Sequence, residues 1–349
     1  MRCPTLSELP SPPPGKTGWP WTEESPQLPD TMPDGRPWPR VRIVTPSYNQ
    51  AQFIEETIRS VLLQGYPNLE YIIIDGGSTD GSVDIIRKYE KWLAYWVSEP
   101  DRGQADAINK GWRVAQGEIV GWLNSDDMYA PGAILTAVAF FQNNPDVDMV
   151  FSDCYIMDSR SQIIDVMRAR EFDLAKQLQT NLIPQPTVFF RRQILQTTGL
   201  LDATLHYIMD YEFWIRVGRR HKIQRIPSVL ARFRVHQGTK SSSQMDGFYA
   251  ERVSTLDRAA RDEELRKYLP NEATKRRGLA HFNVGIVCYG YGEMAQARDH
   301  FLQAVKLYPE LMVRPALLLF MVKSLLGARL MRLLRHWSYR IANRIPKSS

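Results

Sequence analysis

The sequence predicts an α/β fold in which a mixed, mostly parallel sheet carries flanking helices and is followed by a C-terminal α-helical region. Short apolar runs alternate with longer amphipathic segments over residues 41–143, and this alternation is typical of βα units. The last hundred residues lose the alternation and indicate helices. A chain of 349 residues accommodates one main domain of roughly 200–250 residues and a smaller appendage.

The expected elements follow one another along the main domain. Strands are predicted at residues 41–45, 70–75, 95–98, 118–123 and 148–152. Helices are predicted at residues 51–64, 82–89, 104–115, 131–143, 173–180 and 211–221. The predicted divisions are a Pro-rich extension at 1–38, the sheet domain at 39–245, a helical region at 246–310 and a basic amphipathic helix at 311–349.

The first 38 residues are rich in proline and tryptophan, which excludes a helix or a central strand there. Two arrangements remain open. Trp19, Trp21 and Trp38 favour a segment that straps onto the main domain, whereas the composition is also typical of a disordered linker. Residues 15–17, Gly-Lys-Thr, lack the first glycine and the preceding strand of a phosphate-binding loop, so that motif is rejected.

Composition narrows the class of protein. Cys3, Cys154 and Cys288 lie far apart with no CxxC or Cys/His spacing, which predicts a reducing compartment and no zinc site. The N-terminus has no apolar signal-peptide core, so a cytoplasmic protein is expected. The net charge of +6 includes eight basic residues and no acidic residue within 311–349, which leaves about −2 for the rest of the chain. A near-neutral main domain argues against nucleic-acid binding.

The helical region carries a weak repeat signature. Five residues match the late positions of a single tetratricopeptide repeat: Gly285, Ala297, Phe301, Ala304 and Pro309. Cys288 stands where that repeat usually has tyrosine. One repeat cannot bury its own face, so we expect a helical hairpin that leans on its neighbours and not a peptide-binding array.

The segment 311–349 is basic and leucine-rich, and its longest apolar stretch, 315–322, is too short to span a bilayer. An interfacial helix on the anionic inner face of the cytoplasmic membrane is the favoured interpretation, which makes the protein a peripheral membrane protein. The alternative is a helix that packs on the main domain and exposes its basic side.

The strand predicted at 118–123 ends abruptly in Asn124-Ser125-Asp126-Asp127. Adjacent carboxylates at the carboxyl end of a strand lie where open α/β sheets bind ligands. Two hard oxygen donors there suit Mg²⁺ or Mn²⁺ that carries a phosphorylated substrate. An ordinary turn is the alternative, since Asn, Ser and Asp are common turn residues.

Four polar clusters follow predicted strands and a fifth comes later; in order they read TPSYNQ, DGGSTDGS, SEPDRGQADAINKG, NSDD and MDYEFWIR. With these motifs in this order, residues 41 to about 240 resemble glycosyltransferase family 2 with the GT-A fold. The resemblance implies transfer of a sugar from a nucleoside-diphosphate sugar to an acceptor hydroxyl, with inversion and with help from Mg²⁺ or Mn²⁺. The expected acceptor is a glycan or a lipid-linked molecule. The expected process is surface polysaccharide or lipopolysaccharide assembly of the cell envelope.

The resemblance also implies which residues hold the donor nucleotide. Thr45, Pro46, Ser47 and Tyr48 match the loop that holds the base and ribose, and Asp75 matches the acid that hydrogen-bonds the base. A carboxylate accepts from the ring N–H of uracil or thymine, which favours a UDP- or dTDP-sugar. A cap in a glycine-rich turn is the alternative role of Asp75.

The metal and the diphosphate are assigned by the same resemblance. Asp126, Asp127 and His236 match the metal-binding positions, and Asp126 also lies near the ribose. The residues that match positions beside the diphosphate and the sugar are Arg102, Gln104 and Arg234, the last on a loop after the final strand.

Asp210 matches the catalytic base, which removes the acceptor proton, and an N-terminal helix cap is its alternative role. Gln185 is expected on the acceptor side. Three positions depart from the family pattern: Gly76 and Asn124 stand where relatives often have Asp, and Met209 stands where they have Glu.

Three other classes of protein compare less well. A nucleotidyltransferase needs a glycine-rich loop and a lysine, and TPSYNQ has neither. A glycoside hydrolase uses paired carboxylates but needs no nucleotide cleft. A non-catalytic, nucleotide-sugar-binding scaffold docked at the membrane is the main alternative, and Asp126, Asp127 and Asp210 argue against it.

Overall fold

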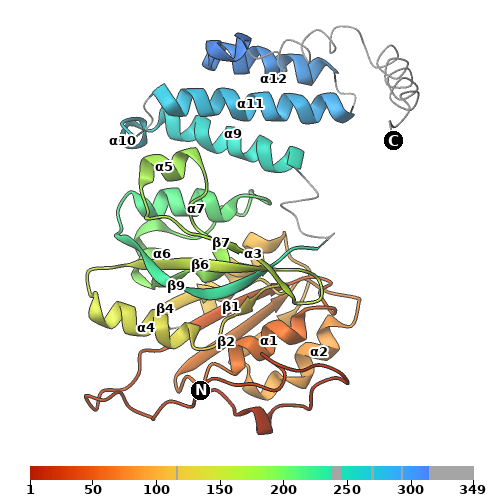
Figure 1. The fold of residues 1–349 in the computed structure, drawn as a ribbon, viewed down its shortest axis with the longest axis vertical. Coiled ribbons are helices and arrows are strands. Elements are labelled where there is room, and N and C mark those ends of the chain that lie inside the picture. The colour runs from red at the N-terminus through yellow and green to blue at the C-terminus, as the bar shows by residue number, and fades with distance from the viewer. Residues whose placement is uncertain (115–116, 237–244, 269–270, 292–293, 314–349) are drawn as a thin grey trace, which may run out of the picture. The chain divides into compact units, whose positions relative to one another are not determined.

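The computed structural model describes residues 1–114, 117–236, 245–268, 271–291 and 294–313 (Figure 1). The chain separates into two compact units, Met1–Thr239 and Lys240–Ser349. Each unit is described by itself.

The first unit is built on one mixed sheet. Its strands are β1 (Val41–Ser47), β2 (Leu69–Asp75), β3 (Tyr95–Ser98), β4 (Ile119–Trp122), β5 (Met128–Tyr129), β6 (Met149–Met157), β7 (Ile163–Met167), β8 (Phe189–Arg191) and β9 (Ile223–Arg234). They lie in the order β3-β2-β1-β4-β8-β6-β9-β5, with β7 paired to β6. Pairings within β3-β2-β1-β4 and between β6 and β9 are parallel, and those of β8, β5 and β7 are antiparallel. Most of the paired residues belong to parallel pairings, so the mixed, mostly parallel α/β prediction is confirmed.

Helices cover both faces of this sheet. They are α1 (Ile54–Leu62), α2 (Ser82–Lys88), α3 (Gln104–Val114), α4 (Ala133–Asn143), α5 (Leu174–Gln179), α6 (Gln193–Thr198) and α7 (Met209–Gly218). Figure 1 shows α1, α2 and α4 on one side and α3, α6 and α7 on the other. Successive β2 residues alternate between the two cores that result: Tyr71 and Ile73 belong to one, and Ile72 and Ile74 to the other. A strand buried on both faces explains the unbroken apolar run that predicted it.

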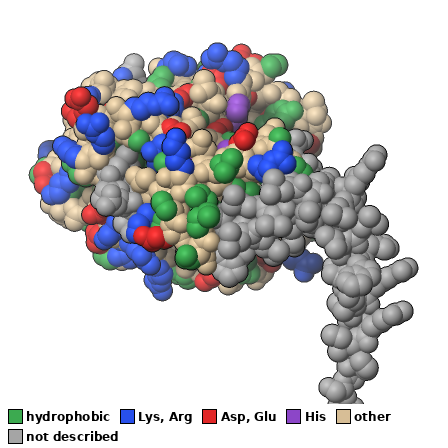
Figure 2. Space-filling view, turned by 90° about the horizontal axis from the view of Figure 1, so that it is seen from above, with side chains coloured by type: hydrophobic (Ala, Val, Ile, Leu, Met, Phe, Trp, Pro, Cys, Tyr) green, Lys and Arg blue, Asp and Glu red, His purple; other side chains and the backbone are tan. Residues whose placement is uncertain are grey.

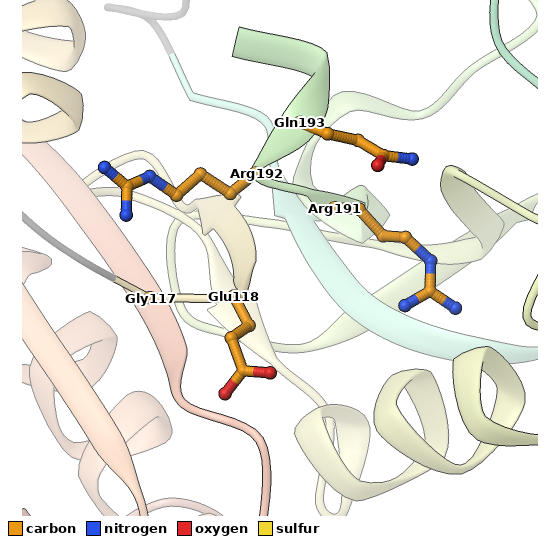
Figure 3. Close-up of a pocket in the computed structure, with 5 residues that line it drawn as sticks. All are labelled: Gly117, Glu118, Arg191, Arg192 and Gln193. Atoms are coloured by element: carbon orange, nitrogen blue, oxygen red, sulfur yellow. The ribbon is translucent and has the colours of Figure 1, made fainter. Parts of the chain in front are cut away.

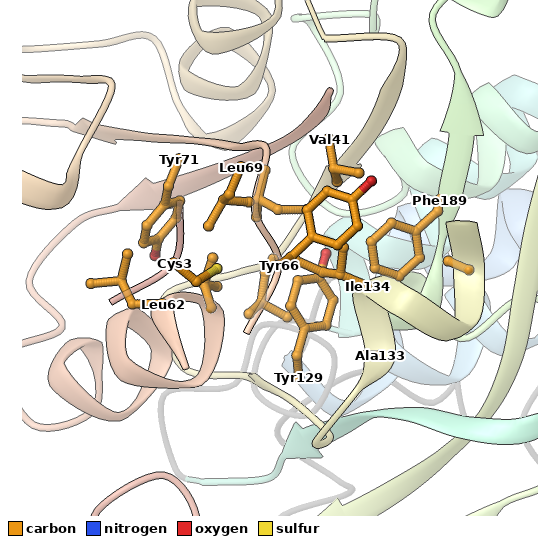
Figure 4. Packing of buried hydrophobic residues seen from close by; sticks show 14 of the residues in the cluster. Cys3, Val41, Leu62, Tyr66, Leu69, Tyr71, Tyr129, Ala133, Ile134 and Phe189 are labelled. Carbon is orange, nitrogen blue, oxygen red and sulfur yellow. The ribbon is translucent and has the colours of Figure 1, made fainter. Parts of the chain in front are cut away.

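The N-terminal strap, residues 1–38, packs on the first unit, so the strap alternative is the one observed. Trp19, Trp21 and Trp38 are all buried, and a short 3-10 turn at Leu6–Glu8 interrupts otherwise extended chain. Cys3 enters the core beside Leu62, Tyr66 and Tyr71, as Figure 4 shows. Burial raises the pKa of the Cys3 thiol to about 12, so this cysteine is an inert core residue.

Two differences from the predicted elements matter for the site. Strand β1 continues past Thr45 to Ser47, because β2 pairs with it as far as Ser47 opposite Asp75. Pro46 is tolerated there because β4 pairs only as far as Val44, which leaves one side of β1 without a ladder. Strand β9, which pairs in parallel with β6, was not predicted, since its run contains Pro227.

The second unit is helical, as predicted. It consists of α9 (Met245–Arg261), α10 (Glu263–Arg266), α11 (Asn271–Tyr291), α12 (Met294–Leu307) and the 3-10 turn η4 (Pro309–Val313). Ala297, Phe301 and Ala304 are fully buried, and a Cβ on Gly285 would lie 2.5 Å from the Phe301 ring, so this glycine lets α11 and α12 approach closely. The tetratricopeptide-like assignment stays a prediction.

The remaining observations concern the surface side chains and the C-terminal segment. Basic, acidic and apolar side chains are interspersed on the face that Figure 2 presents. Among the described residues, no helix combines the length and the apolar character needed to cross a bilayer. The basic helix predicted at 311–349 lies outside the described residues from 314 onward.

Candidate active site

The predicted site residues gather at one edge of the sheet. Strands β1, β2, β3 and β4 are mutually parallel, so the loops that follow them all leave from their carboxyl ends. The residues after β4, Asn124–Asp127, form what we call the acidic loop. In an open sheet this edge is the usual place for a ligand.

Asn124 is the centre of an amide network in the acidic loop. Its Oδ1 accepts from Gln104 Nε2 at 2.7 Å, and its Nδ2 donates to Gln185 Oε1 at 3.0 Å and to Asp127 Oδ2 at 3.4 Å. Gln185 Nε2 in turn donates to the carbonyl of Trp122 at the end of β4 (3.0 Å). The structure therefore brings Gln104, Gln185 and Asp127 together, and an amide at position 124 both donates and accepts, which a carboxylate cannot do.

Asp127 is fully buried. Its Oδ1 accepts the backbone N–H of Arg234 at 2.9 Å. Burial, and then the charge of Asp126, raise the pKa of Asp127 well above its usual value. A cation beside this pair would hold both carboxylates in their charged form.

Asp126 and His236 lie in contact, with His236 Nε2 3.1 Å from Asp126 Oδ2. The Phe53 ring packs on the imidazole at a centroid distance of 4.7 Å and fixes its orientation. Among the described residues, no group of three or more His, Cys, Asp or Glu side chains is arranged to hold a metal. Mg²⁺ and Mn²⁺ do not need one, because they are commonly held by one or two carboxylates together with substrate phosphates. Asp126 and Asp127 supply two such carboxylates, and the assignment of Asp126, Asp127 and His236 to a metal stays a prediction.

Arg234 does not lie where the resemblance implied. It is the last residue of β9, not part of the following loop, and its side chain is completely buried. The guanidinium donates to the carbonyls of Asp126 (2.7 Å) and Asp158 (3.2 Å) and to Glu56 Oε2 (2.7 Å). A buried guanidinium committed to protein oxygens supports the acidic loop and is not presented to a diphosphate.

Helix α1 holds the acidic loop from behind. Thr57 Oγ1 bonds to the carbonyls of Ser125 (2.9 Å) and Asp127 (2.7 Å). Ser60 Oγ accepts the backbone N–H of Tyr129, and Gln64 Nε2 donates to the carbonyl of Ala130. Thr57 and Ser60 on α1, and Gln64 just after the helix, thus give partners to the backbone of the acidic loop and of the residues that follow it.

Asp75 also differs from its implied role, because its carboxylate is already saturated with hydrogen bonds. Oδ1 accepts from the hydroxyls of Ser47 (3.0 Å) and Ser78 (2.6 Å). Oδ2 accepts from Ser98 Oγ (2.7 Å) and from the N–H groups of Gly77 (3.1 Å) and Ser78 (2.8 Å). Five donors tie the ends of β1, β2 and β3 together, which is the structural alternative that the sequence left open.

The four residues assigned to the base and ribose, Thr45–Tyr48, differ in exposure. Thr45 is buried with its hydroxyl 3.1 Å from that of Tyr71, and Pro46 and Ser47 are buried too. Of the four residues assigned to the base and ribose, Tyr48 alone is well exposed, at 62%. An exposed aromatic ring at a strand end suits stacking with a base.

Asp101 is a candidate that the sequence reasoning missed. A Cβ placed on Gly76 would lie 2.8 Å from Asp101 Oδ2 and 3.3 Å from Tyr48 Cδ2, so the missing side chain leaves room for the Asp101 carboxylate beside the Tyr48 ring. Oδ1 accepts the N–H of Gly103 at 2.8 Å. Glycine at position 76, where relatives often have Asp, was the one sign in the sequence of a change at this position. Only the fold shows that Asp101 fills the space of the missing side chain.

Arg102 lies at the rim of this edge. Its side chain is 81% exposed and reaches Asp106 Oδ1 at 3.3 Å. A Cβ on Gly103 would approach His206 Nδ1 to 3.3 Å, so the loop before α7 passes over the start of α3. Exposure leaves the Arg102 cation able to turn towards an anion.

Asp210 lies in the first turn of α7, whose N-cap is Ile208, so it is not the cap. Burial raises the pKa of Asp210 to about 6, although the N–H of Tyr211 and the amide of Asn181 (3.2 Å) lower it. Asn181 and Gln185 belong to one loop, and Gln185 bonds to Asn124. This loop links the carboxylate of Asp210 to the acidic loop.

A shallow pocket of about 280 Å³ lies elsewhere (Figure 3). It is lined by Gly117, Glu118, Arg191, Arg192 and Gln193. These residues lie at the amino end of β4 and the carboxyl end of β8. The acidic loop follows the other end of β4. The pocket is therefore separate from the site described above.

Comparison with known proteins agrees with the fold and with the motifs. The family model for glycosyl transferase family 2 matches residues 42–199. An uncharacterized glycosyltransferase of Mycobacterium tuberculosis is 32% identical over 181 residues, which cover 51% of this chain and 68% of that protein. An uncharacterized glycosyltransferase of Rickettsia typhi is 28% identical over 222 residues, or 60% of this chain and 68% of the relative.

Solved structures share the fold. The S. aureus TarS 1–349 structure in complex with UDP-GlcNAc has a TM-score of 0.60 at 18% identity and covers 82% of this chain and 88% of that one. Against a longer TarS structure, the match covers 53% of the TarS chain. The mannosyltransferase PcManGT from Pyrobaculum calidifontis, in complex with GDP-Man and Mn²⁺, has a TM-score of 0.56 at 20% identity and covers 89% of this chain. On the sequence relatives and this GT-A-like fold, the chain belongs to glycosyltransferase family 2.

Proposed function

We propose that this glycosyltransferase moves a sugar from a nucleoside-diphosphate sugar to an acceptor hydroxyl with inversion at the anomeric carbon. One observation carries the proposal. The loop 181–185 joins Asp210, a carboxylate of raised pKa, to the Asn124 network of the acidic loop. A base for the acceptor and acidic groups for a metal-bound diphosphate are thus both hydrogen-bonded to the same short loop.

The donor nucleotide is placed over the ends of β1 to β3. Tyr48 offers its exposed ring to the base, and Asp101 offers the acceptor Oδ2 beside it, while its Oδ1 accepts the N–H of Gly103. A carboxylate acceptor matches the ring N–H of uracil or thymine, whereas it repels the ring nitrogen acceptor of cytosine. The solved neighbours carry UDP-GlcNAc and GDP-Man, which supports a nucleotide sugar as the class of donor. A UDP- or dTDP-sugar is the donor we propose.

Mg²⁺ or Mn²⁺ is the proposed cofactor, held by Asp126, Asp127 and His236. When bound, such an ion supplies Lewis-acid stabilisation of the diphosphate leaving group. Buried Arg234 keeps the two aspartates in place through the Asp126 carbonyl and the Asp127 carboxylate. Exposed Arg102 is the cation proposed to turn towards the diphosphate.

Asp210 removes the proton of the acceptor hydroxyl as that oxygen attacks the anomeric carbon. The oxygen–carbon bond forms as the bond from the anomeric carbon to the diphosphate oxygen breaks, so one displacement inverts the configuration. The raised pKa makes Asp210 a stronger base than an ordinary aspartate, and Asn181 orients its carboxylate. Gln185, fixed by Trp122 and Asn124, supports the acceptor side.

The acceptor and the location follow from the sequence of the tail. A basic, leucine-rich segment at 311–349 favours a glycan or lipid-linked acceptor at the inner face of the cytoplasmic membrane. We propose a role in surface polysaccharide or lipopolysaccharide assembly. The competing function is a nucleotide-sugar-binding scaffold without turnover.

The test is release of nucleoside diphosphate from a panel of nucleotide sugars, with and without Mn²⁺ or Mg²⁺. Metal-dependent release from a uridine or thymidine donor is the expected result. Donors that raise the melting temperature but are not consumed, with glycan and lipid-linked acceptors supplied, would favour the scaffold.

A further inference from the structure

We propose that the N-terminal strap is a working part of the active site: Trp21 and Glu56 are positioning residues that hold the acidic loop through Arg234. The proposal rests on the proposed function for its catalytic consequence, but its structural part can be tested without it. The strap precedes residues 42–199, the region that the family model matches, so this support is supplied by the chain's own extension.

The strap is fixed to helix α1 by one buried arginine. Arg59 Nε donates to the carbonyl of Pro20 (3.0 Å), Nη2 to that of Trp21 (3.0 Å), and Nη1 to that of Pro10 (2.8 Å). The guanidinium also lies 5.1 Å from the Trp21 ring centroid. Three bonds from a fully buried cation define the path of the strap at Trp21.

Glu56, on the same helix, joins the strap to the active-site edge. Its Oε1 accepts from Trp21 Nε1 at 3.0 Å, and Lys16 Nζ lies 3.5 Å away. Its Oε2 accepts from Arg234 Nη2 at 2.7 Å and from Ser161 Oγ at 2.6 Å. One carboxylate oxygen therefore faces the strap and the other faces the arginine behind the acidic loop.

Burial opposes ionisation of Glu56, but bonds from Ser161 and Trp21 and the charge of Arg234 lower its pKa overall. The carboxylate is 5% exposed and is held by these partners in place of water. Removing the indole N–H of Trp21 leaves an under-satisfied buried oxygen, which frees Glu56 to turn away from Arg234.

Arg234 completes the path. Its backbone N–H holds Asp127 Oδ1 at 2.9 Å, its Nε holds the Asp126 carbonyl at 2.7 Å, and its guanidinium lies 4.6 Å from the Phe53 ring that also packs on His236. All three proposed metal-binding residues are thus in contact with Arg234 or Phe53. Outer-shell groups of this kind commonly affect metal affinity by 10- to 100-fold.

The strap also contacts the residues that follow the acidic loop, through two other hydrogen bonds. Trp19 Nε1 donates to the carbonyl of Tyr129 at 2.9 Å, and Ser25 Oγ accepts the N–H of Gly132 at 3.0 Å. These bonds fix the chain just after the acidic loop, so the strap holds both the loop and its exit.

The test compares W21F and E56Q with matched controls in the full chain. W38F also removes a buried indole N–H, but Trp38 donates to the Pro29 carbonyl within the strap. E70Q also weakens a buried arginine pair, but Glu70 accepts from Arg42 at the start of β2. Neither control contacts the acidic loop.

The primary measurement is hydrogen exchange in peptides covering residues 124–130, with peptides covering β2 as the internal reference. We expect W21F and E56Q to speed exchange in 124–130 by about tenfold without changing β2, and W38F to leave both unchanged. E70Q, which lies in β2 itself, should leave 124–130 unchanged. Unchanged exchange in 124–130, or equal acceleration in β2, would overturn the proposal. W21F is the milder change and decides the matter if E56Q does not fold.

A second readout is Mn²⁺ binding followed by electron paramagnetic resonance in the presence of UDP. The half-saturating Mn²⁺ concentration should rise roughly tenfold in E56Q and about threefold in W21F, with the controls unchanged. Wild-type protein that binds no Mn²⁺ would contradict the proposed metal site, while the exchange measurement would still decide on the strap.

Discussion

Two aspartates after β2 and β3 show how neighbouring carboxylates differ in their hydrogen bonding. Asp75 accepts five hydrogen bonds inside the protein, whereas Asp101 commits one oxygen to Gly103 and brings the other to the glycine at position 76. The number of internal donors, and not the identity of the side chain, separates a structural carboxylate from one available to a ligand.

The D101N variant tests this division. An amide can both donate and accept, so D101N is expected to reduce affinity for UDP about tenfold and to narrow its advantage over CDP. D75N is the matched comparison: it leaves buried donors without acceptors and should cost about 2–4 kcal/mol of folding free energy. Calorimetric titration with UDP and CDP, together with chemical unfolding, checks both. A D101N protein that keeps wild-type selectivity would exclude Asp101 from base recognition.

Asp210 is the residue whose chemistry depends most directly on pH. The base must be ionised, and its pKa is raised to about 6, so activity should fall as pH drops through about 6. Asn181 donates to Asp210 and lowers that pKa, so N181A should move the acid limb of kcat/KM to higher pH. N144A removes an amide that bonds the carbonyl of Phe140 and should leave the limb in place. If kcat/KM of N181A had the same pH dependence as that of the wild type, the loss of activity at low pH would not be due to Asp210.

At the scale of elements, helix α1 links the strap, the sheet and the acidic loop. Its apolar residues Ile54, Ile58 and Leu62 enter the core, while polar residues at neighbouring turns point to backbone groups of the loop and the strap. Glu, Thr, Arg and Ser buried on a helix are uncommon, and each of them here has partners for its polar atoms.

The T57V variant tests the helix's hold on the loop. Valine keeps the shape of threonine but removes the hydroxyl that bonds the carbonyls of Ser125 and Asp127. We expect a loss of about 1–3 kcal/mol in folding free energy and a higher half-saturating Mn²⁺ concentration for activity. T136V removes a comparable bond to the Gly132 carbonyl in α4 and should lower stability alone. An equal rise of the half-saturating Mn²⁺ concentration in T57V and T136V would contradict a specific role for α1.

The main elements could be predicted from the sequence because β1, β2, β4 and the early helices carry strong apolar periodicity. Strand β9 could not, because Pro227 interrupts its run and the ladder to β6 passes from Ile226 to Val229, skipping Pro227 and Ser228. The motifs indicated the site edge. They did not distinguish Asp75 from Asp101 or reveal that Arg234 is buried, since those facts depend on side chains from distant strands.

At the scale of the molecule, an extended segment without regular structure contributes to the organisation of the first unit. Prolines keep the strap from forming helix or sheet, and its tryptophans supply both buried area and single directed hydrogen bonds. The same residues that excluded secondary structure thus bring residues 1–38 against α1 and the chain after β4.

The basic tail gives a prediction about location. Truncation after Pro309 should reduce co-sedimentation with vesicles of anionic lipid several-fold, and the loss should be greatest at low salt, because the eight basic residues within 311–349 are removed. Vesicles of neutral lipid are the control. Equal co-sedimentation of the full and truncated chains would remove the support for membrane docking.

The most direct measurement of the central claim is the comparison of donor binding and turnover in wild type and D210N. D210N is expected to bind the nucleotide sugar as tightly as wild type but to turn it over 10²- to 10⁴-fold more slowly, because the acceptor proton has no base. D210N that transfers sugar at the wild-type rate would contradict the catalytic assignment and the mechanism built on it.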